Sequence, residues 1–425
     1  MNTTNKKNIY VLGGGTVFHL RPHFALSAPA YGKTARKIAG ILSKKLNTDE
    51  NYNVITGLTK MCGSVKDNEV CIGETNSDVT SYVESIISDP FSKIVFFSSA
   101  ICDFEGNVGE INNNTFIRST SGKNEKRLQS RTDTQMYVEL KASDKIIKKI
   151  REYRKDIFLV GFKTTAGATE DEQYQAGLEL LKSNSCNLVL ANDVHTGLNM
   201  IICPEMAKYS VSTERDVVLN ELVNISLMRS SNVFERTTIL NGELVDFNSE
   251  QVPDVLRKVV KWAVENGAYK PFNNVTVGHF GFLDNNSTLW SSRRKQNYNL
   301  PGALDLVKVD FLQNKPIAYG AKPSAGVRSQ NMVLKAYKPQ NSCIIHFHCP
   351  ILPNSKVKVM SQKPFECGSI QCGNNTISGL TYINDNISAV MLDKHGPNIV
   401  FSDNAKAEDV ISFIKENFDL SRQTS

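Results

Sequence analysis

Three histidines in the second half of the chain have the type and spacing of metal ligands. His346 and His348 lie two residues apart in an apolar run, so in a β-strand their side chains leave the same face. His395 follows another apolar run further along. Three imidazole ligands with an open fourth position are typical of catalytic zinc. An isolated His-x-His pair on a strand is also compatible with two packed structural histidines.

A glycine run that ends in Thr16 follows the first strand-like segment and could bind phosphate. Glycines at a strand end let the backbone approach a phosphate, and a nearby helix start attracts anions. The run is not a GxGxxG fingerprint, because Phe18 stands where its last glycine belongs, and Gly32-Lys33-Thr34 lacks the first glycine of a Walker A loop. A phosphate-binding loop and a plain tight turn therefore remain alternatives.

Several motifs between residues 8 and 240 together resemble phosphopantothenoylcysteine synthetases. Gly14-Gly15-Thr16 followed by Gly32-Lys33 is similar to the opening motif of that family. The later segments that match in order are Ser99–Phe104 with Asp103, the basic stretch Lys123–Arg131, Val138–Leu140 with Asp144, Val160–Phe162, and Ala191–Val194.

This resemblance implies a ligase that uses CTP or ATP with Mg²⁺. In such a reaction a substrate carboxylate attacks the α-phosphate, and an amine then captures the acyl-nucleotide. Lys126 and Arg127 are the candidates for catalytic neutralisation of phosphate charge, and Arg21 and Arg131 are further phosphate-binding cations. The resemblance implies nucleotide binding by Gly14, Gly15, Thr16, Gly32, Lys33, Asp103, Gly161, Phe162, Ala191, Asn192 and Asp193. A solvated basic face and a helix-capping Asp103 are the alternatives.

The first motif departs from the family pattern at four positions. Phe18, Arg21, Phe24 and Ala28 stand where the family carries Glu, Asp, Arg and Asn. The missing Asn belongs to the acyl-nucleotide site of the family. Nucleotide binding is therefore the main expectation for this half of the chain.

Residues 253–420 resemble class II aldolases and their adducin-type relatives. Lys322-Pro-Ser324-Ala is similar to the Lys-Pro-Ser-Ser motif of that family, and His346-x-His348 with His395-Gly396 matches its zinc ligands in order. The resemblance implies Zn²⁺ bound by His346, His348 and His395. It also implies a phosphate site at Ser324 and at His279, which takes the usual position of an Asn.

Family aldolases carry a catalytic Glu directly after the serine pair, and Gly326 stands there in this chain. Related dehydratases also lack this Glu and take an acid/base group from elsewhere. Glu366 is the candidate here, since a carboxylate near the metal can move protons to and from a substrate carbon. The alternative is that Glu366 is a surface residue of a degenerate metal-binding scaffold.

The elements that must position these residues alternate in the first half between strand-like and helical stretches. This alternation predicts an α/β fold with a Rossmann-like, mainly parallel sheet covered on both faces. Ligands of such sheets bind where loops leave the carboxyl ends of the strands. The expected strands are Ile9–Leu12, Lys93–Phe97, Ile157–Val160 and Leu188–Leu190, and the expected helices are Thr34–Leu46, Asp144–Tyr153 and Glu172–Ser183.

A polar, turn-rich segment at Asn241–Val252 marks the predicted domain boundary. The prediction is a phosphopantothenoylcysteine synthetase-like nucleotide-binding domain at residues 1–245 and a class II aldolase-like α/β/α zinc domain at residues 253–425. In the second domain, helices are expected at Val255–Asn266 and Ala407–Phe418. Its expected strands are Asn274–Gly278, Leu304–Phe311, Cys343–His348 and Ser388–Leu392.

The composition excludes several classes of protein. The chain has 425 residues, of which 40% are hydrophobic, enough for two globular domains. The net charge of +6 is spread along the chain, which favours small anionic substrates over nucleic acid. No apolar run approaches the roughly 20 residues of a membrane span, and no signal-peptide pattern is present. The nine scattered cysteines argue against a disulfide framework, so a cytoplasmic location is expected.

Together these patterns predict a bifunctional enzyme. It would combine zinc-dependent aldolase or dehydratase chemistry on a phosphorylated or nucleotide-linked sugar with a nucleotide-dependent ligation. One alternative is a single-pathway enzyme whose first domain only binds a nucleotide-like substrate, and another is an adducin-like metal-binding scaffold. A homo-oligomer is expected by analogy with both families.

Overall fold

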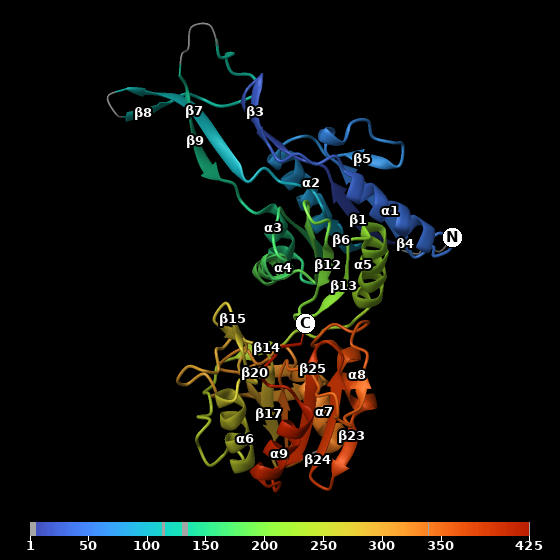
Figure 1. Ribbon diagram of the computed structural model, residues 1–425, viewed down its shortest axis with the longest axis vertical. Helices are drawn as coiled ribbons and strands as arrows, with labels where there is room; N and C mark the ends of the chain where they lie inside the picture. Colours follow the sequence, from blue (N-terminus) through green and yellow to red (C-terminus); the bar gives the residue numbers. More distant parts are fainter. Residues whose placement is uncertain (1–5, 113–114, 130–134, 339, 425) are drawn as a thin grey trace. The chain divides into compact units, whose positions relative to one another are not determined.

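The computed structural model describes residues 6–112, 115–129, 135–338 and 340–424 (Figure 1). The chain divides into two compact units. The first comprises Met1–Cys203 and Tyr209–Ser230, and the second comprises Pro204–Lys208 and Ser231–Ser425. The short segment Pro204–Lys208 thus groups with the second unit, although it lies between two stretches of the first in sequence. Residues 231–245 also group with the second unit.

The first unit is built on an eight-stranded sheet with the order β13-β12-β11-β10-β6-β1-β4-β5. The pairs from β11 across to β5 are parallel, and β12 is antiparallel to β11. The predicted α/β fold with a Rossmann-like, mainly parallel sheet is confirmed. The strands are β1 (Lys7–Gly13), β4 (Tyr52–Leu58), β5 (Glu69–Cys71), β6 (Ser92–Phe97), β10 (Phe158–Thr165), β11 (Leu188–Asp193), β12 (Asn199–Ile202) and β13 (Lys208–Ser212).

Helices cover both faces of this sheet (Figure 1). On one face α1 (Lys33–Lys45) packs beside α5 (Arg215–Ser230), and on the other α3 (Ile146–Tyr153) packs between α2 (Asn76–Ser88) and α4 (Glu170–Asn184). Because neither face meets water, the central strands are apolar on both sides, and Ile9–Leu12 is buried throughout. The predicted helices begin and end within one or two residues of α1, α3 and α4.

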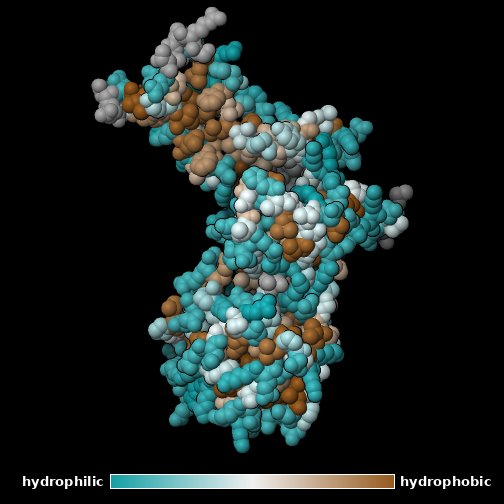
Figure 2. All heavy atoms as spheres, in the orientation of Figure 1, coloured by the Kyte–Doolittle hydropathy of each residue, from teal (hydrophilic) through white to brown (hydrophobic). Residues whose placement is uncertain are grey.

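A smaller three-stranded sheet with the order β8-β7-β9 also belongs to the first unit. Its strands are β7 (Phe104–Asn112), β8 (Thr115–Arg118) and β9 (Tyr137–Ala142). On one face the register aligns Phe104, Val138, Leu140 and Ile117, all of them exposed. Figure 2 shows the apolar side chains gathered over this sheet. Next in the chain to β1, β2 (Val17–Arg21) and β3 (Phe24–Ser27) form a hairpin.

The second unit is built on a ten-stranded sheet with the order β14-β20-β19-β18-β17-β21-β25-β24-β22, and β23 pairs with β24. Most neighbours are antiparallel, while β14/β20 and β22/β24 are parallel. The strands are β14 (Thr238–Leu240), β17 (His279–Leu283), β18 (Leu289–Ser292), β19 (Leu306–Leu312), β20 (Lys315–Tyr319), β21 (Ser342–His346), β22 (Val359–Met360), β23 (Thr381–Asn384), β24 (Ile387–Leu392) and β25 (Gly396–Ser402).

Two helices lie on each face of this sheet, as the predicted α/β/α arrangement requires. On one face α6 (Asp254–Glu265) packs with α9 (Ala407–Asn417), and on the other α7 (Val327–Tyr337) packs with α8 (Ile370–Gly379). Residues of β21 alternate between the two cores. Cys343 and Ile345 belong to the α6/α9 core, and Ile344 belongs to the α7 core.

One expected strand of the second unit is wrong in its limits. Within Asn274–Gly278 only the two residues of β16 (Val275–Thr276) are extended, paired with β15 (Pro271–Phe272), and the buried strand β17 begins at His279 instead. Positive φ angles at Asn273, Asn274 and Gly278 break the run, because they turn the chain away from extended geometry. Among the described residues, no helix is both long and apolar enough to cross a membrane.

Candidate functional site

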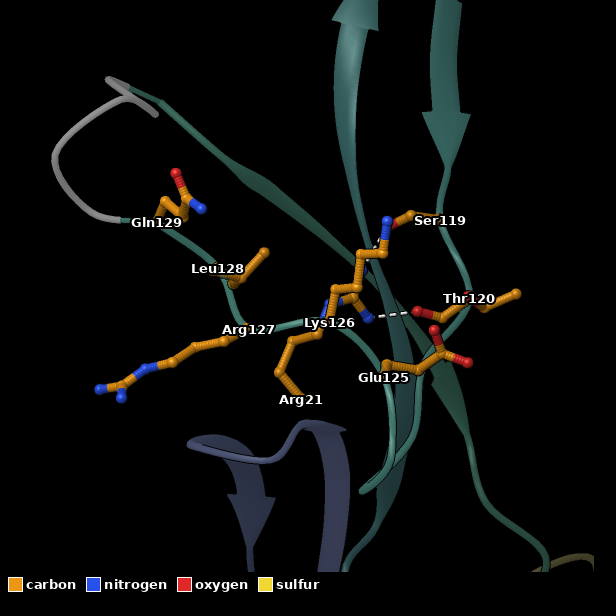
Figure 3. Close-up of a pocket in the computed structure, with 8 residues that line it drawn as sticks. All are labelled: Arg21, Ser119, Thr120, Glu125, Lys126, Arg127, Leu128 and Gln129. Carbon is orange, nitrogen blue, oxygen red and sulfur yellow. Dashed lines mark hydrogen bonds between the residues drawn. The ribbon is translucent and has the colours of Figure 1, made fainter.

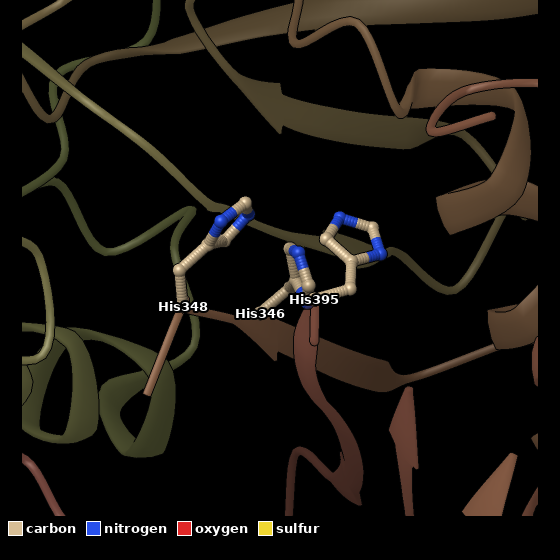
Figure 4. Close-up of side chains that lie close together, drawn as sticks. All are labelled: His346, His348 and His395. Atoms are coloured by element: carbon tan, nitrogen blue, oxygen red, sulfur yellow. The ribbon is translucent and has the colours of Figure 1, made fainter. Parts of the chain in front are cut away.

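The three predicted metal ligands lie together in the second unit. His346 is the last residue of β21, His348 follows two residues later, and His395 lies in the turn between β24 and β25. One candidate ligand atom from each ring lies within 4.8 Å of the others, and all three residues are buried. Figure 4 shows the three imidazole rings next to one another. The antiparallel pairing of β21, β25 and β24 brings His395 back beside His346.

Backbone carbonyls orient two of these rings. The Nδ1 atom of His346 lies 2.8 Å from the carbonyl oxygen of Pro397, and that of His348 lies 3.0 Å from the carbonyl oxygen of Glu205. A carbonyl only accepts, so Nδ1 carries the proton in each ring, and the lone pair is on Nε2. Nε2 of His346 is buried without a hydrogen-bond partner in the described part of the chain. The ring chemistry therefore fits a metal ligand set.

Burial keeps the rings of His346 and His279 neutral, and the neutral imidazole is the form that binds a metal. Burial lowers the pKa of His346 to about 4, and its bond to Pro397 offsets only part of this effect. Burial also lowers the pKa of His279 well below its ordinary value, and the neighbouring rings of His346 and His348 add to the effect.

His279 packs against the three histidines and lies close to Gly326, the position at which the resembled class II aldolases carry Glu. It pairs with His346 across β17 and β21, and the two ring centroids are 4.8 Å apart. A Cβ atom at Gly326 would lie 3.1 Å from Nε2 of His279 and 3.8 Å from Oγ of Ser324. The structure thus brings together His279, Ser324 and Gly326, and the His279 ring stands where a side chain at residue 326 would project.

Glu366 lies in a loop that packs against the same segment. A Cβ atom at Gly368 would approach the carbonyl oxygen of Ala325 to 2.7 Å, so the loop and the start of α7 are in close contact. The backbone N–H of Glu366 donates to Oδ1 of Asn232 at 2.7 Å, and Glu366 is only 8% exposed. Glu366 is therefore not a solvated surface residue.

In the first unit, several predicted nucleotide ligands gather at one edge of the sheet. Gly14 follows β1, Phe162 lies in β10, and Asn192 lies near the end of β11. Gly161 is buried in the middle of β10, and Ala191 is buried two residues before the end of β11. Since β1, β6, β10 and β11 are parallel neighbours, their carboxyl ends lie along the same edge, where α/β sheets bind ligands.

The glycine turn uses its backbone groups for internal bonds. The N–H groups of Gly15 and Thr16 donate to the carbonyl oxygens of Ala30 and Ala100, at 2.8 and 3.0 Å. The Thr16 hydroxyl bonds to Asn76 and accepts from the N–H of Cys102. A Cβ atom at Gly14 would lie 2.2 Å from Oγ1 of Thr59. Close packing thus accounts for the glycine at position 14, as the tight-turn alternative requires.

The Asp193 carboxylate is hydrogen-bonded to the loops around it. Its carboxylate accepts from the backbone N–H groups of Ala168, His195 and Thr196 and from the hydroxyl of Thr165. The N–H of Thr196, followed by those other donors, holds the pKa of Asp193 well below its usual range in spite of burial. Asp193 therefore holds loops in place at the carboxyl edge of the sheet, and its oxygens already accept hydrogen bonds from the protein.

A basic cavity of about 410 Å³ lies beside the β2–β3 hairpin. Its lining includes three of the predicted cations, Arg21, Lys126 and Arg127 (Figure 3). Arg21 is buried and donates to the carbonyl oxygens of Leu20 and Thr120 and to Oγ of Ser119. Figure 3 shows the Arg127 guanidinium extending away from the other labelled side chains.

The remaining predicted residues of the first unit are placed as follows. Gly32 has a positive φ of 72° and precedes α1, whose first residue Lys33 is exposed. Asp103 is exposed and pairs with Lys145. Arg131 lies outside the described residues.

The contacts that orient the histidines were not predicted from the sequence. They involve backbone carbonyls of Pro397 and Glu205, and backbone groups carry no side-chain signal. Another unpredicted residue is Asn76, which links the Thr16 hydroxyl to the carbonyl of Cys102. Its place at the start of α2, after the capping Thr75, is a local signal that could have located it.

The chain has partial similarity to proteins of known sequence and structure. No family model matches the sequence. Over 119 residues the chain is 26% identical to the coenzyme A biosynthesis bifunctional protein CoaBC of Thermococcus kodakarensis, a match that covers 28% of this chain. The chain spans about a quarter (26%) of the length of that curated relative.

Two solved structures are similar to parts of the chain. The DNA/pantothenate metabolism flavoprotein of Streptococcus pneumoniae is 21% identical, with a TM-score of 0.43 over 52% of this chain and 97% of that chain. An L-fuculose 1-phosphate aldolase is 18% identical, with a TM-score of 0.28 over 39% of this chain and 82% of that chain.

The Asp193 network predicts a pH-dependent loss of stability. We expect Asp193→Asn to lower the free energy of unfolding at pH 7, because the amide cannot accept all the bonds that the carboxylate accepts. A carboxyl with a depressed pKa stabilises the fold above its unfolded pKa of about 4 and loses this contribution as the pH falls further. Urea denaturation should therefore show a difference between the wild type and the variant that shrinks below about pH 4.

The exposed Asp67 supplies a matched control, since Asp67→Asn makes the same chemical change in a solvated loop. A difference that stays constant down to pH 3, or equal effects of the two substitutions, would contradict the structural role of Asp193.

Proposed function

We propose that the second unit binds zinc through His346, His348 and His395 and that the protein is an enzyme acting on a phosphorylated or nucleotide-linked sugar. The observation that carries this proposal is the convergence of three buried imidazoles, of which Nε2 of His346 has no partner among the described residues. Burying such groups without a ligand costs free energy, so the arrangement is supported by its fit to a cation.

A bound zinc ion supplies Lewis-acid polarisation of a substrate oxygen. Around it, the chain positions its own polar groups. His279 and Ser324 lie beside Gly326 and can hydrogen-bond oxygens of an anionic substrate. Glu366, in the loop against Ala325, is the carboxylate proposed to move a proton to and from a substrate carbon. The three histidines are buried, and the exclusion of water from such a site strengthens these interactions.

For the first unit we propose binding of a nucleotide at the carboxyl edge of the sheet, with CTP or ATP and Mg²⁺ as the candidates. Lys126 and Arg127 line the basic cavity and can reach phosphate oxygens, whereas the Arg21 guanidinium already has three acceptors. We therefore propose that the cavity binds the phosphates. Gly15 and Thr16 have a structural role, because their N–H groups donate to carbonyl oxygens of the chain itself.

A ligase reaction of the phosphopantothenate–cysteine type is the second candidate function for this unit. It is favoured by the sequence match to the CoaBC protein. Binding without turnover remains the alternative, and it follows from Ala28 in the position where the resembled family carries Asn. Nucleotide hydrolysis in the presence of a carboxylate and an amine distinguishes the two.

Assembly of identical chains stays a prediction. The surface that it would use is the exposed apolar face of the β8-β7-β9 sheet, which includes Phe104, Leu140 and Ile117. A face of this kind is typical of protein interfaces.

Metal analysis tests whether the three histidines bind zinc. We expect about one zinc per chain in the purified protein, and loss of that zinc when His346→Ala and His348→Ala are combined, since one ligand cannot hold it. His23→Ala is the matched control, because His23 is exposed in the first unit. Equal zinc in the double variant, or none in the wild type, would refute the metal site.

Glu366→Gln tests the proton-transfer role. With phosphorylated sugars such as L-fuculose 1-phosphate as probes, we expect turnover to fall by about a hundredfold or more while the zinc content is unchanged. Glu408→Gln, at the exposed start of α9, provides the control. Turnover that survives in Glu366→Gln would assign the proton transfer to another group.

Calorimetric titration with CTP and with ATP, each with Mg²⁺, tests the basic cavity. We expect Lys126→Ala and Arg127→Ala each to weaken binding by about tenfold, because each removes one charged contact to phosphate. Lys44→Ala, on the exposed end of α1, should have no effect. Unchanged affinity in both cavity variants would place the phosphates elsewhere.

A further inference from the structure

Two of the three histidines lie outside the regular strands. His346 belongs to β21, where pairing with His279 on one side and Asn398 on the other fixes its backbone. His348 comes after β21 has ended, and His395 lies in the turn before β25. The sheet alone therefore does not determine the distance between His348 and His395.

A single residue near the end of the sequence bridges these two. The backbone N–H of Thr424 donates to the carbonyl oxygen of His348 at 3.0 Å, and its hydroxyl Oγ1 donates to the carbonyl oxygen of His395, also at 3.0 Å. Thr424 is only 6% exposed, so water competes little for these bonds.

The segment that carries Thr424 is itself anchored. After α9, Phe418 packs on Phe347 with ring centroids 5.8 Å apart, and its backbone forms a bridge with Ile351. The N–H of Asp419 then donates to the carbonyl oxygen of Pro350 at 2.9 Å, and the Gln423 amide donates to that of Lys270. Most of these contacts are with residues on either side of His348. They hold in place the segment that precedes Thr424.

We propose that Thr424 is a positioning residue for the histidine cluster, and that its two hydrogen bonds raise the affinity of the protein for a divalent metal. The inference rests on the proposed zinc site. A ligand set that is held at its binding geometry loses less conformational freedom when the ion binds. Groups that orient the ligands of a metal commonly change its affinity by ten to a hundredfold.

By linkage, a bound ion would hold the segment 419–424 as firmly as the segment holds the ligands. Metal binding is therefore expected to slow tryptic cleavage after Arg422, the basic residue within this segment.

The test measures metal affinity rather than turnover, in the full chain. Zn²⁺ is titrated in competition with a chromophoric chelator, and Co²⁺ is followed by its visible absorption. We expect Thr424→Val, which keeps the N–H but loses the hydroxyl, to bind Zn²⁺ about tenfold more weakly and to alter the Co²⁺ spectrum. Thr424→Ser keeps both donors and should restore the wild-type affinity.

Thr376→Val is the matched control, because its hydroxyl also donates to a backbone carbonyl, that of Cys372, in a buried position on α8. Thermal unfolding without metal shows whether each variant is folded, and Thr424→Ala gives a less bulky change if the valine is not accepted. Equal affinity in Thr424→Val and wild type would overturn this inference alone. The same loss in Thr376→Val would also overturn it, since the effect would then be general. A wild type that binds neither ion would overturn the zinc proposal and this inference together.

Discussion

The hydrogen bonds from two imidazole Nδ1 atoms to backbone carbonyl oxygens determine what the second unit can do. A carbonyl cannot donate, so the protons of His346 and His348 must lie on the side of Pro397 and Glu205, and the lone pairs lie on the opposite nitrogens. Burial keeps the His346 ring uncharged at neutral pH. The register of β21 with β25 and the two hydrogen bonds of Thr424 help to hold the three histidines together, with one candidate ligand atom from each ring within 4.8 Å of the others.

The first unit follows a different constraint, which is the burial of both faces of its parallel sheet. Polar side chains such as Asn192 and Asp193 lie at the carboxyl end of a central strand, β11. The glycine run at the end of β1 allows segments from three parts of the chain to approach, and its N–H groups serve that packing. The hypothesis of nucleotide binding therefore rests on the cations of residues 119–129.

The sequence predicted the features that depend on local patterns. The apolar run around His346-x-His348 predicted that the two side chains lie close together, although β21 ends at His346, and the alternation of strands with helices predicted the parallel sheet. Helix α2 was not among the expected helices, although Thr75 and Asp78 form a capping box at its start. Residue type and the preceding apolar run grouped His395 with the other two histidines, and the family resemblance gave the same set.

What could not be predicted depends on contacts between residues far apart in sequence. The carbonyl of Glu205 is 143 positions from His348, and a backbone oxygen has the same chemistry in every residue type. The bonds of Asp193 to the nearby Thr196 and to Ala168, 25 positions away, were also missed, because an Ala-Asn-Asp motif at a strand end is equally compatible with ligand binding and with loop shaping. Thr424 was missed for the same reason as Glu205, since its partners are carbonyl oxygens.

The grouping of Pro204–Lys208 with the second unit affects how this chain can be divided into fragments. The polypeptide passes between the units at three points, so no single cut yields two complete halves. A fragment that starts at Ser231 lacks the carbonyl that orients His348. During synthesis, one piece of the second unit leaves the ribosome before the last helix of the first, α5. A simple end-to-end fusion of two domains has one crossing point, whereas this chain has three.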